Sequence, residues 1–357
     1  MDLTKERLNN LKENIETLYA DELVDLKTDV DKQVLNKTMA KDALHKVIKK
    51  ERKRPKACKV CGSTHIVKNG KTKQGRQKYR CMDCGKSYSD THDSIVKGSK
   101  KPYHVWESFI RCMMNGFSLR KTSSLIDVTT QTAFTWRHKV MQALADYDRS
   151  YKLSEEIQID ETYFLLNMKG SRKLPRPAKK RGTKGRKRGI SNEFACVLTA
   201  VDANDHLIID IIGQGNPEIG SIIHALDHRL EPNATIITDS KSAYHEVSKY
   251  FSSKIHQIPS HAYAKGVHNL AVINGLHSEM KTWFKKFKGV STKHLARYLA
   301  WFRFEKLLRY QYDMKRHHRK CMNYAISNNL IFLTDTISKQ PFPIDTELPY
   351  QQNQYFA

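Results

Sequence analysis

Apolar residues in the first fifty positions recur at intervals of three or four, which is the spacing of one helix face. No glycine or proline interrupts the pattern. The sequence therefore predicts helices in an N-terminal region, residues 1–54. Two roles stay open for them: a bundle that covers a neighbouring part of the chain, or a self-association surface. The apolar positions are Leu8, Leu11, Ile15 and Leu18, then Leu23, Leu26, Val30 and Val34, then Leu44, Val47 and Ile48.

From about residue 153 the pattern changes to short apolar runs that alternate with helix-like segments. Three runs joined by turns come first, and helices and strands then alternate. This layout is typical of an RNase H-like α/β domain at residues 153–310, with a C-terminal tail at 311–357, so we expect a multidomain α+β chain. Strands are predicted at 156–160, 194–201, 206–212, 234–239 and 253–258, and helices at 218–229, 240–250, 274–287 and 292–308.

Charge narrows the range of partners. The 357 residues carry a formal net charge of +25, from 62 Lys and Arg against 37 Asp and Glu, which indicates nucleic acid or an anionic membrane surface. No run of about 18 apolar residues occurs, and the N-terminus is charged, so neither a membrane span nor a secretory signal is expected.

One segment holds the densest positive charge. Eleven Lys or Arg and no acid lie between residues 169 and 188. This segment is either a disordered loop or a clamp on the DNA backbone. Both can hold together, because the loop can become ordered when phosphates neutralise its charge. Its candidate DNA contacts are Lys179, Lys180, Arg181, Arg186, Lys187 and Arg188.

The chain has seven cysteines, four of them in two CxxC pairs. The odd total argues against a disulfide framework and for a reducing compartment. Each pair, Cys58 with Cys61 and Cys81 with Cys84, is followed directly by a glycine. Two such turns supply four thiolates to one tetrahedral zinc ion. We therefore predict a zinc ribbon over residues 55–100, with one structural Zn²⁺ and no open position for His65.

A helical segment follows at residues 101–150. It is broken at Asn115 and Gly116, and two shorter helices come after the break. This rhythm is that of a helix-turn-helix DNA-binding region, although any packing of three helices can produce it. The candidate DNA contacts are Arg120, Lys121, Gln131, Arg137 and Lys139.

Two acids, Asp160 and Asp239, come at the C-terminal ends of predicted strands. Neighbouring strands lie about 5 Å apart, so the two carboxylates can converge on a pair of Mg²⁺ or Mn²⁺ ions, which suit phosphoryl transfer. Acids at strand ends also serve as plain helix caps. Glu161 is adjacent, but its side chain faces away from that of Asp160.

A later helix supplies further polar groups. Asn274, His277 and Lys281 are spaced at i, i+3 and i+7 and therefore share one face. Glu279 points away from that face.

These segments together resemble the IS1595-type (ISXO2-like) transposases over roughly residues 55–310. The motifs are Gln158-Ile-Asp-Glu-Thr-Tyr-Phe164, Thr238-Asp-Ser240, Ile273-Asn-Gly-Leu-His-Ser-Glu-Met-Lys281 and the stretch 287–301. The resemblance implies a DDE-class transposase that cuts the terminal inverted repeats of an insertion sequence and joins them to target DNA. It also implies a homo-oligomer that pairs two DNA ends, in the nucleoid-associated cytoplasm of a bacterium.

In this family the third catalytic position is either Glu or Asn, with a Lys seven residues after the Asn. The resemblance thus implies Asp160, Asp239 and Asn274 as Mg²⁺ ligands and Lys281 as a contact to DNA. His277 would position the scissile phosphate or simply pack, and Glu279 is the rival for the third position. Two other functions stay open: a non-catalytic, sequence-specific DNA-binding regulator derived from a transposase, and an RNA-directed nuclease that rests on fold analogy alone.

Overall fold

The computed structural model describes residues 3–38, 55, 57–58, 60–73, 75–89, 91–145, 147, 151–171, 174, 184–259, 262, 264–311, 317–327, 337, 339–340 and 343. The chain divides into two compact units. The first comprises residues 1–137 and 321–329, and the second comprises residues 138–320 and 330–357. No helix in the described ranges is long and apolar enough to cross a lipid bilayer.

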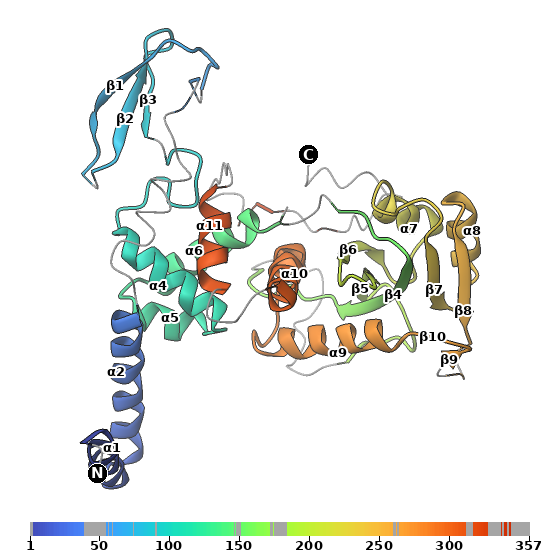
Figure 1. The fold of residues 1–357 in the computed structure, drawn as a ribbon, viewed down its shortest axis with the longest axis horizontal. Helices are drawn as coiled ribbons and strands as arrows, with labels where there is room; N and C mark the ends of the chain where they lie inside the picture. The colour runs from blue at the N-terminus through green and yellow to red at the C-terminus, as the bar shows by residue number, and fades with distance from the viewer. Residues whose placement is uncertain are drawn as a thin grey trace. The chain divides into compact units, whose positions relative to one another are not determined.

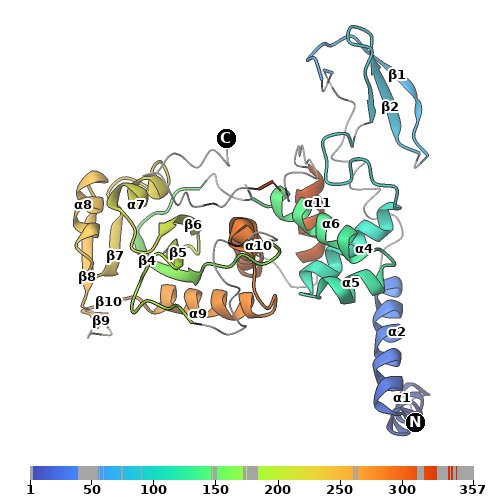
Figure 2. The ribbon, with the colours of Figure 1, turned by 180° about the vertical axis from the view of Figure 1, so that it is seen from behind.

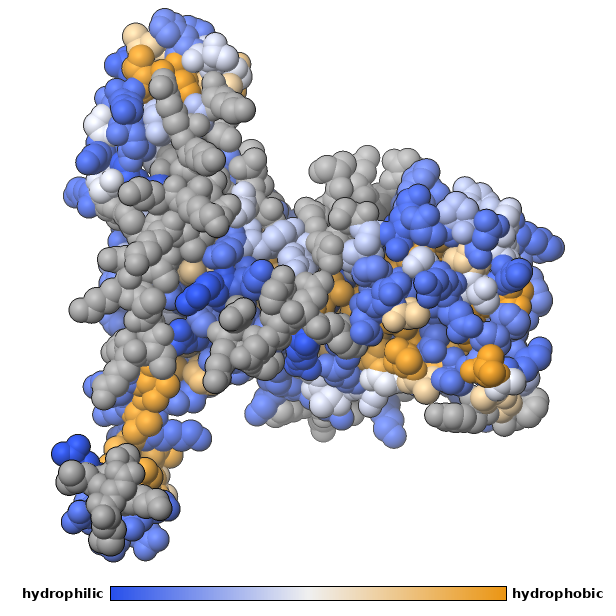
Figure 3. Space-filling view, viewed as in Figure 1, coloured by the Kyte–Doolittle hydropathy of each residue, from blue (hydrophilic) through white to orange (hydrophobic). Residues whose placement is uncertain are grey.

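Two helices open the first unit, as the sequence predicts. They are α1 (Leu3–Glu16) and α2 (Ala20–Thr38). Several of their apolar residues are exposed, with Leu11 60% and Val24 63% exposed. Figure 3 shows apolar side chains along α2. The expected apolar positions at 44–48 lie outside the described residues.

A small antiparallel sheet follows, in the order β1-β2-β3. Its strands are β1 (Ile66–Lys71), β2 (Gln77–Cys81) and β3 (Ser87–Ser89). The strand-like pieces His65–Lys68 and Gln77–Arg80, which flank a Gly- and Lys-rich turn, predict the first two strands. The third strand is too short to show a period. The core of this sheet contains only five buried residues: Cys58, Ile66, Tyr79, Cys81 and Tyr88.

Three helices come next: α4 (Tyr103–Met114), α5 (Leu119–Leu125) and α6 (Thr130–Ala143). The predicted break at Asn115 is the C-cap of α4. The side chain of Ser118 caps α5 by accepting a hydrogen bond from the Lys121 N–H. Trp106 of α4 stacks on Trp136 of α6, with 3.8 Å between ring centroids, so these two helices share a core. The last helix of this part of the chain is α11 (His317–Ser327).

The second unit is built on a five-stranded sheet in the order β6-β5-β4-β7-β8 (Figure 1). Strands β4, β5 and β6 are antiparallel neighbours, whereas β7 and β8 run parallel to β4. This order of three hairpin-linked strands followed by two crossovers is the one that the apolar pattern predicts. The strands are β4 (Glu156–Leu165), β5 (Phe194–Asp202), β6 (Leu207–Gln214), β7 (Thr235–Asp239) and β8 (Lys254–Ile258).

Helices cover both faces of this sheet. On one face, Ile157 and Ile159 of β4 share a core with Tyr244 and Val247, which belong to the helix α8 (Ala243–Tyr250); α7 (Ile219–Leu226) packs into the same core. On the other face lies α9 (Ala271–Lys285), opposite α7 in both views (Figures 1 and 2). This helix begins three residues before the predicted Asn274.

The remaining elements connect or close this unit. The helix α10 (Leu295–Gln311) packs against β6 and follows the short turn η1 (Thr292–His294). A hairpin of two short strands, β9 (Ala264–Lys265) and β10 (His268–Asn269), precedes α9. The apolar pattern of the sequence does not predict it.

Candidate active site

The prediction that Asp160 ends a strand is wrong. Strand β4 continues to Leu165 and pairs with β5 along this length, so Asp160 lies in its middle. Its parallel neighbour β7, however, pairs with β4 only as far as Gln158, which faces Ile237. Asp160 and Asp239 each come two residues beyond that pair. Because side chains alternate along a strand, the two aspartates lie at the same level of adjacent strands and point to the same face of the sheet. Asp239 does end its strand, as predicted.

The side chain of Asp160 is 19% exposed. Burial raises the pKa of this carboxyl to about 6, and the carboxylates of Glu161 and Asp239 add to the rise. The N–H of Glu161, which donates to Oδ1 of Asp160 over 2.8 Å, and the ammonium of Lys241 act in the opposite direction. Burial therefore outweighs the neighbouring groups in setting the pKa of Asp160.

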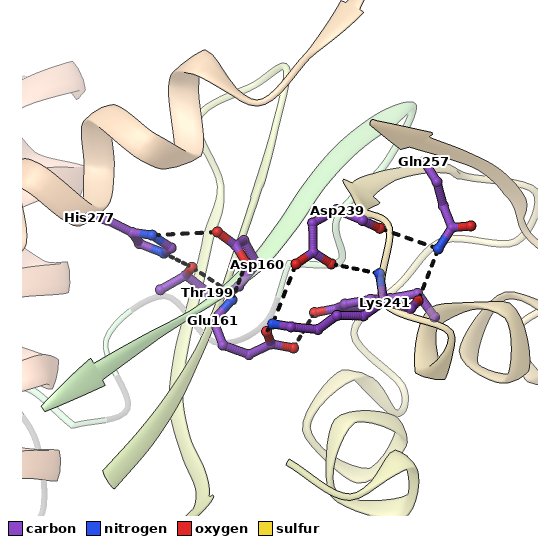
Figure 4. A network of polar contacts seen from close by, with 8 residues as sticks. Asp160, Glu161, Thr199, Asp239, Lys241, Gln257 and His277 are labelled. Carbon is purple, nitrogen blue, oxygen red and sulfur yellow. Dashed lines mark hydrogen bonds and ion pairs between the residues drawn. The ribbon is translucent and has the colours of Figure 1, made fainter. Parts of the chain in front are cut away.

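Glu161 faces the opposite side of β4, as the strand period predicts. Its buried carboxylate accepts a hydrogen bond from the Tyr244 hydroxyl at 2.7 Å and forms an ion pair with Lys241. The Nζ of Lys241 also lies 3.5 Å from Oδ2 of Asp239, so one ammonium links the two acids (Figure 4). Sequence reasoning missed Lys241, whose only signal is its place two residues after Asp239.

A second side chain fixes the corner between β7 and α8. The amide of Gln257 on β8 donates to the backbone oxygens of Asp239, at 3.3 Å, and of Lys241, at 2.9 Å. The Ser240 hydroxyl donates to the Ile258 oxygen at 3.1 Å. These bonds tie the acid-bearing corner to the next strand (Figure 4).

His277 of α9 lies beside the Asp160 carboxylate, on the side of β4 opposite to Glu161. Its Nε2 is 2.6 Å from the Thr199 hydroxyl, and its Nδ1 is 3.7 Å from Oδ2 of Asp160. Thr199 faces Asp160 across the β4–β5 pair and donates to its backbone oxygen at 2.8 Å. Burial lowers the pKa of His277 to about 4, assisted by Lys281 and Lys241, so the ring is neutral near pH 7.

The other predicted positions on α9 are placed differently. Asn274 and Lys281 lie one turn before and after His277 and are exposed; within the described ranges, neither makes a hydrogen bond or ion pair with the aspartates. Glu279 points to α10, where Lys306 at 2.5 Å and Arg309 at 2.7 Å hold its carboxylate. The geometry thus brings together Asp160, Asp239 and His277 and gives Glu279 other partners.

The four cysteines form a second cluster. All four sulfurs lie within 4.8 Å of one another, with 3.7 Å between Cys58 and Cys84 and 3.6 Å between Cys61 and Cys81. Tetrahedral zinc with bonds of about 2.3 Å needs sulfurs about 3.8 Å apart, and these two pairs are close to that spacing. Gly62 and Gly85 adopt φ of 76° and 68°, which explains a glycine after each pair.

The predicted DNA contacts divide by exposure. Arg137 is only 2% exposed and donates to the Phe117 carbonyl at 2.9 Å, so its prediction as a DNA contact is not supported; its guanidinium stabilises the turn before α5. Lys121 pairs with Asp31 of α2 at 2.5 Å. Arg120, Gln131, Arg186, Lys187 and Arg188 are exposed, Lys139 is half-buried, and Lys179, Lys180 and Arg181 lie outside the described residues.

Comparison with known proteins gives one family match, which lies within the second unit. Residues 152–306 match the ISXO2-like transposase domain, which confirms the resemblance for this part of the chain. No curated protein matches the sequence.

Solved structures overlap only weakly. One is a simian T-cell lymphotropic virus intasome in complex with PP2A regulatory subunit B56 gamma, at 14% identity over 54% of this chain and 66% of that chain, with a TM-score of 0.25. Another is a pre-cleavage Mos1 transpososome, at 11% identity over 64% and 80%, with a TM-score of 0.22. This chain covers just under two thirds of the length of the intasome chain. Overlap at these TM-scores supports no conclusion on fold or function.

Proposed function

Because residues 152–306 match the ISXO2-like transposase domain, we propose that this protein is a DDE-class transposase that cuts DNA at terminal inverted repeats and transfers the ends to target DNA. The observation that carries the proposal is that Asp160 and Asp239 lie at the same level of two adjacent strands of the sheet. The second unit would then be an RNase H-like catalytic domain.

The donor set at this site suits Mg²⁺ or Mn²⁺. The carboxylates of Asp160 and Asp239 lie at the same level of adjacent strands, and the Lys241 ammonium pairs with Asp239 and with Glu161 on the opposite side of β4. Carboxylate oxygens are the ligands that such hard cations prefer. Asp160 and Asp239 would hold the ions, with the uncharged amide of Asn274 as the third ligand. When bound, paired cations supply activation of an attacking oxygen and stabilisation of a leaving oxygen.

The other residues would orient the two aspartates and the DNA. The N–H of Glu161 binds the Asp160 carboxylate, and Lys241 lies against Asp239. Lys281, one turn after His277, would contact a phosphate of the bound end. The exposed residues Arg186, Lys187 and Arg188 would extend this contact along the backbone.

The first unit would recognise the terminal repeat. The four-cysteine cluster would bind one structural zinc ion, since a Cys₄ site leaves no open position for chemistry. The exposed Arg120 and Gln131 stand near the starts of α5 and α6, where a helix-turn-helix presents its groups to DNA. A homo-oligomer would hold two ends together.

The test uses a labelled duplex of the terminal repeat, incubated with the full chain and with Mg²⁺, Mn²⁺ or EDTA. We expect cleavage with metal only, and a fall of at least about 100-fold for Asp239→Asn, the scale of losing one electrostatic stabiliser of a transition state. Asp205→Asn is the matched control, because Asp205 lies in the β5–β6 turn with φ of 62°, which asparagine tolerates. Binding without cleavage would identify a regulator instead. Cleavage by both Asp160→Asn and Asp239→Asn would refute the catalytic assignment.

A further inference from the structure

The small sheet β1-β2-β3 has one face that its apolar core leaves open, which we call the outer face. Val67 of β1 pairs with Arg80 of β2, and Arg80 pairs with Ser87 of β3. Paired residues share a face, and Lys78 shares it too because side chains alternate along a strand. The Asn69 amide donates to the Ser87 hydroxyl at 3.2 Å, which places Asn69 on the same face. The opposite face carries the buried residues Ile66, Tyr79, Cys81 and Tyr88.

The hairpin of β1 and β2 carries positive charge that the described part of the chain does not neutralise. Six Lys or Arg and no acid lie between residues 66 and 80. The acid nearest in sequence, Asp83, pairs with His65 instead. Five of the six basic side chains reach solvent and form no ion pair within the described ranges: Lys68, Lys71, Lys73, Lys78 and Arg80. Clustered charges of one sign attract a polyanion such as the DNA backbone.

The hairpin also has the shape of a ribbon that fits a DNA groove. Strand β3 pairs only with residues 78–80 of β2, whereas β1 and β2 continue past it as a pair to Lys71 and Gln77 (Figure 1). The Thr72 N–H closes the turn by donating to the Arg76 oxygen at 2.7 Å. The major groove of B-DNA, about 12 Å wide, admits a two-stranded β-ribbon, and strands of several DNA-binding proteins lie there. The ribbon is therefore preformed for this groove.

We propose that the β1–β2 hairpin lies in the major groove of the terminal repeat, with its outer face toward the base edges. The guanidinium of Arg80 donates two hydrogen bonds to a guanine, which is the commonest specific contact in this groove. The Lys71 ammonium, at the end of β1, binds a phosphate. This inference rests on the proposed function and adds a second reading element to the helices that carry Arg120 and Gln131.

Three substitutions separate base reading from charge. Arg80→Lys keeps the positive charge but loses the planar fork that binds a base at two points. Lys71→Ala removes a phosphate contact and leaves the outer face intact. Lys68→Ala is the matched control, because it removes one exposed charge from the same strand but on the opposite face, where Lys68 pairs with Tyr79.

The experiment is equilibrium binding of the zinc-loaded full chain to a labelled duplex of the terminal repeat, without Mg²⁺ or Mn²⁺ so that the DNA stays uncut. Competitor duplexes replace each base pair in turn, and the salt concentration is varied. In the wild type, replacing one G·C pair should weaken binding at least about fivefold, and Arg80→Lys should lose that preference alone. Lys71→Ala should weaken binding to every duplex and make the slope of log K against log salt shallower by about 0.9. Lys68→Ala should change neither quantity.

The outcomes separate this inference from the proposed function. If Arg80→Lys kept every base preference of the wild type, or if Lys68→Ala weakened binding as much as Lys71→Ala, the role of the hairpin would be overturned and the transposase proposal would stand. A wild type that neither prefers the terminal repeat over a scrambled duplex nor cleaves it with metal would overturn the proposed function, and the inference with it. Zinc content and hydrogen-exchange protection of residues 66–89 show that each variant is folded.

Discussion

The chain holds two clusters of side chains that we propose as metal sites, and the two are assembled in opposite ways. The cysteine cluster draws its four sulfurs from two short turns, at 58–61 and 81–84, around one small sheet. The acid site draws its groups from three strands and a helix: Asp160 on β4, Thr199 on β5, Asp239 on β7 and His277 on α9. The first is local in sequence, and the second depends on the register of a whole sheet.

The two clusters also differ in what holds them in place. The small sheet buries five residues, two of which are the cysteines Cys58 and Cys81. The acid site rests on an apolar core shared by β4 to β7 with α7 and α8. Under the proposed function, a cation would stabilise the fold at the first cluster, whereas at the second an apolar core holds the fold and a cation would serve catalysis.

The largest effect should follow from removing a cysteine. Cys81→Ser leaves three sulfurs, and a structural zinc site is worth about 10–16 kcal/mol in small zinc modules. We expect residues 66–89 to lose hydrogen-exchange protection and the protein to lose its zinc and its terminal-repeat binding. Protection in the five-stranded sheet should stay unchanged. Met82→Ser, at an exposed position between the same cysteines, should keep the metal. Full protection of the small sheet in Cys81→Ser would show that its apolar core suffices alone.

The next effect concerns the polar support of the acid site. Glu161→Gln removes the charge that Lys241 and Tyr244 contact, and an impaired buried hydrogen-bond network costs about 1–3 kcal/mol. The free energy of unfolding of the second unit, measured by urea titration, should fall by that amount. Glu246→Gln, with a side chain 54% exposed beside Lys249, should change it by less than about 0.5 kcal/mol. Equal effects of the two variants would mean that the buried network adds nothing.

The sequence predicted the cysteine cluster, whose residues are close together in the chain, more completely than the acid site, whose residues are far apart in the chain. CxxC spacing with a following glycine specifies a turn whatever the rest of the chain does. The strand order of the second unit was also predictable, because apolar runs and turns reveal hairpins and crossovers. The mid-strand position of Asp160 was not, since the polar residues from Glu161 to Tyr163 hide the continuation of β4. Lys241 and the burial of Arg137 depend on packing partners far away in the sequence, and no local pattern reveals them.

The acid site should respond to pH between about 5 and 7. Burial raises the pKa of Asp160 from 3.8 to about 6, and a cation needs the ionised carboxylate. Apparent Mn²⁺ affinity should therefore rise about tenfold from pH 5 to pH 7 and then level off. Calorimetric titration at each pH measures it, and Asp160→Asn should flatten the profile. A wild-type affinity that does not change between pH 5 and 7 would contradict the raised pKa.

The pH dependence of the free energy of unfolding, measured without metal, is a poor measure of Asp160 and His277. The raised pKa of Asp160 means that the folded state binds more protons than the unfolded chain, so this group lowers stability as pH rises from about 4 to 6. The depressed pKa of His277 has the opposite sign, since it raises stability as pH rises from about 4 to 6.5. Because the two windows overlap, the contributions largely cancel, and metal affinity is the quantity to follow.

The smallest effect should come from Glu279, which tests where the acid site ends. Glu279 lies two residues after His277 on α9, but Lys306 and Arg309 of α10 hold its carboxylate. A carboxylate that is 30% exposed in such a pair contributes about 1 kcal/mol or less. Glu279→Gln should therefore lower the free energy of unfolding by no more than that and leave the cleavage rate within about twofold, whereas Asn274→Ala should lower cleavage strongly. If Glu279→Gln instead abolished cleavage with unfolding unchanged, the pair with α10 would have to open when DNA binds, and the third acid would be Glu279. The present geometry, with the carboxylate turned to α10 and His277 turned to Asp160, favours the first result.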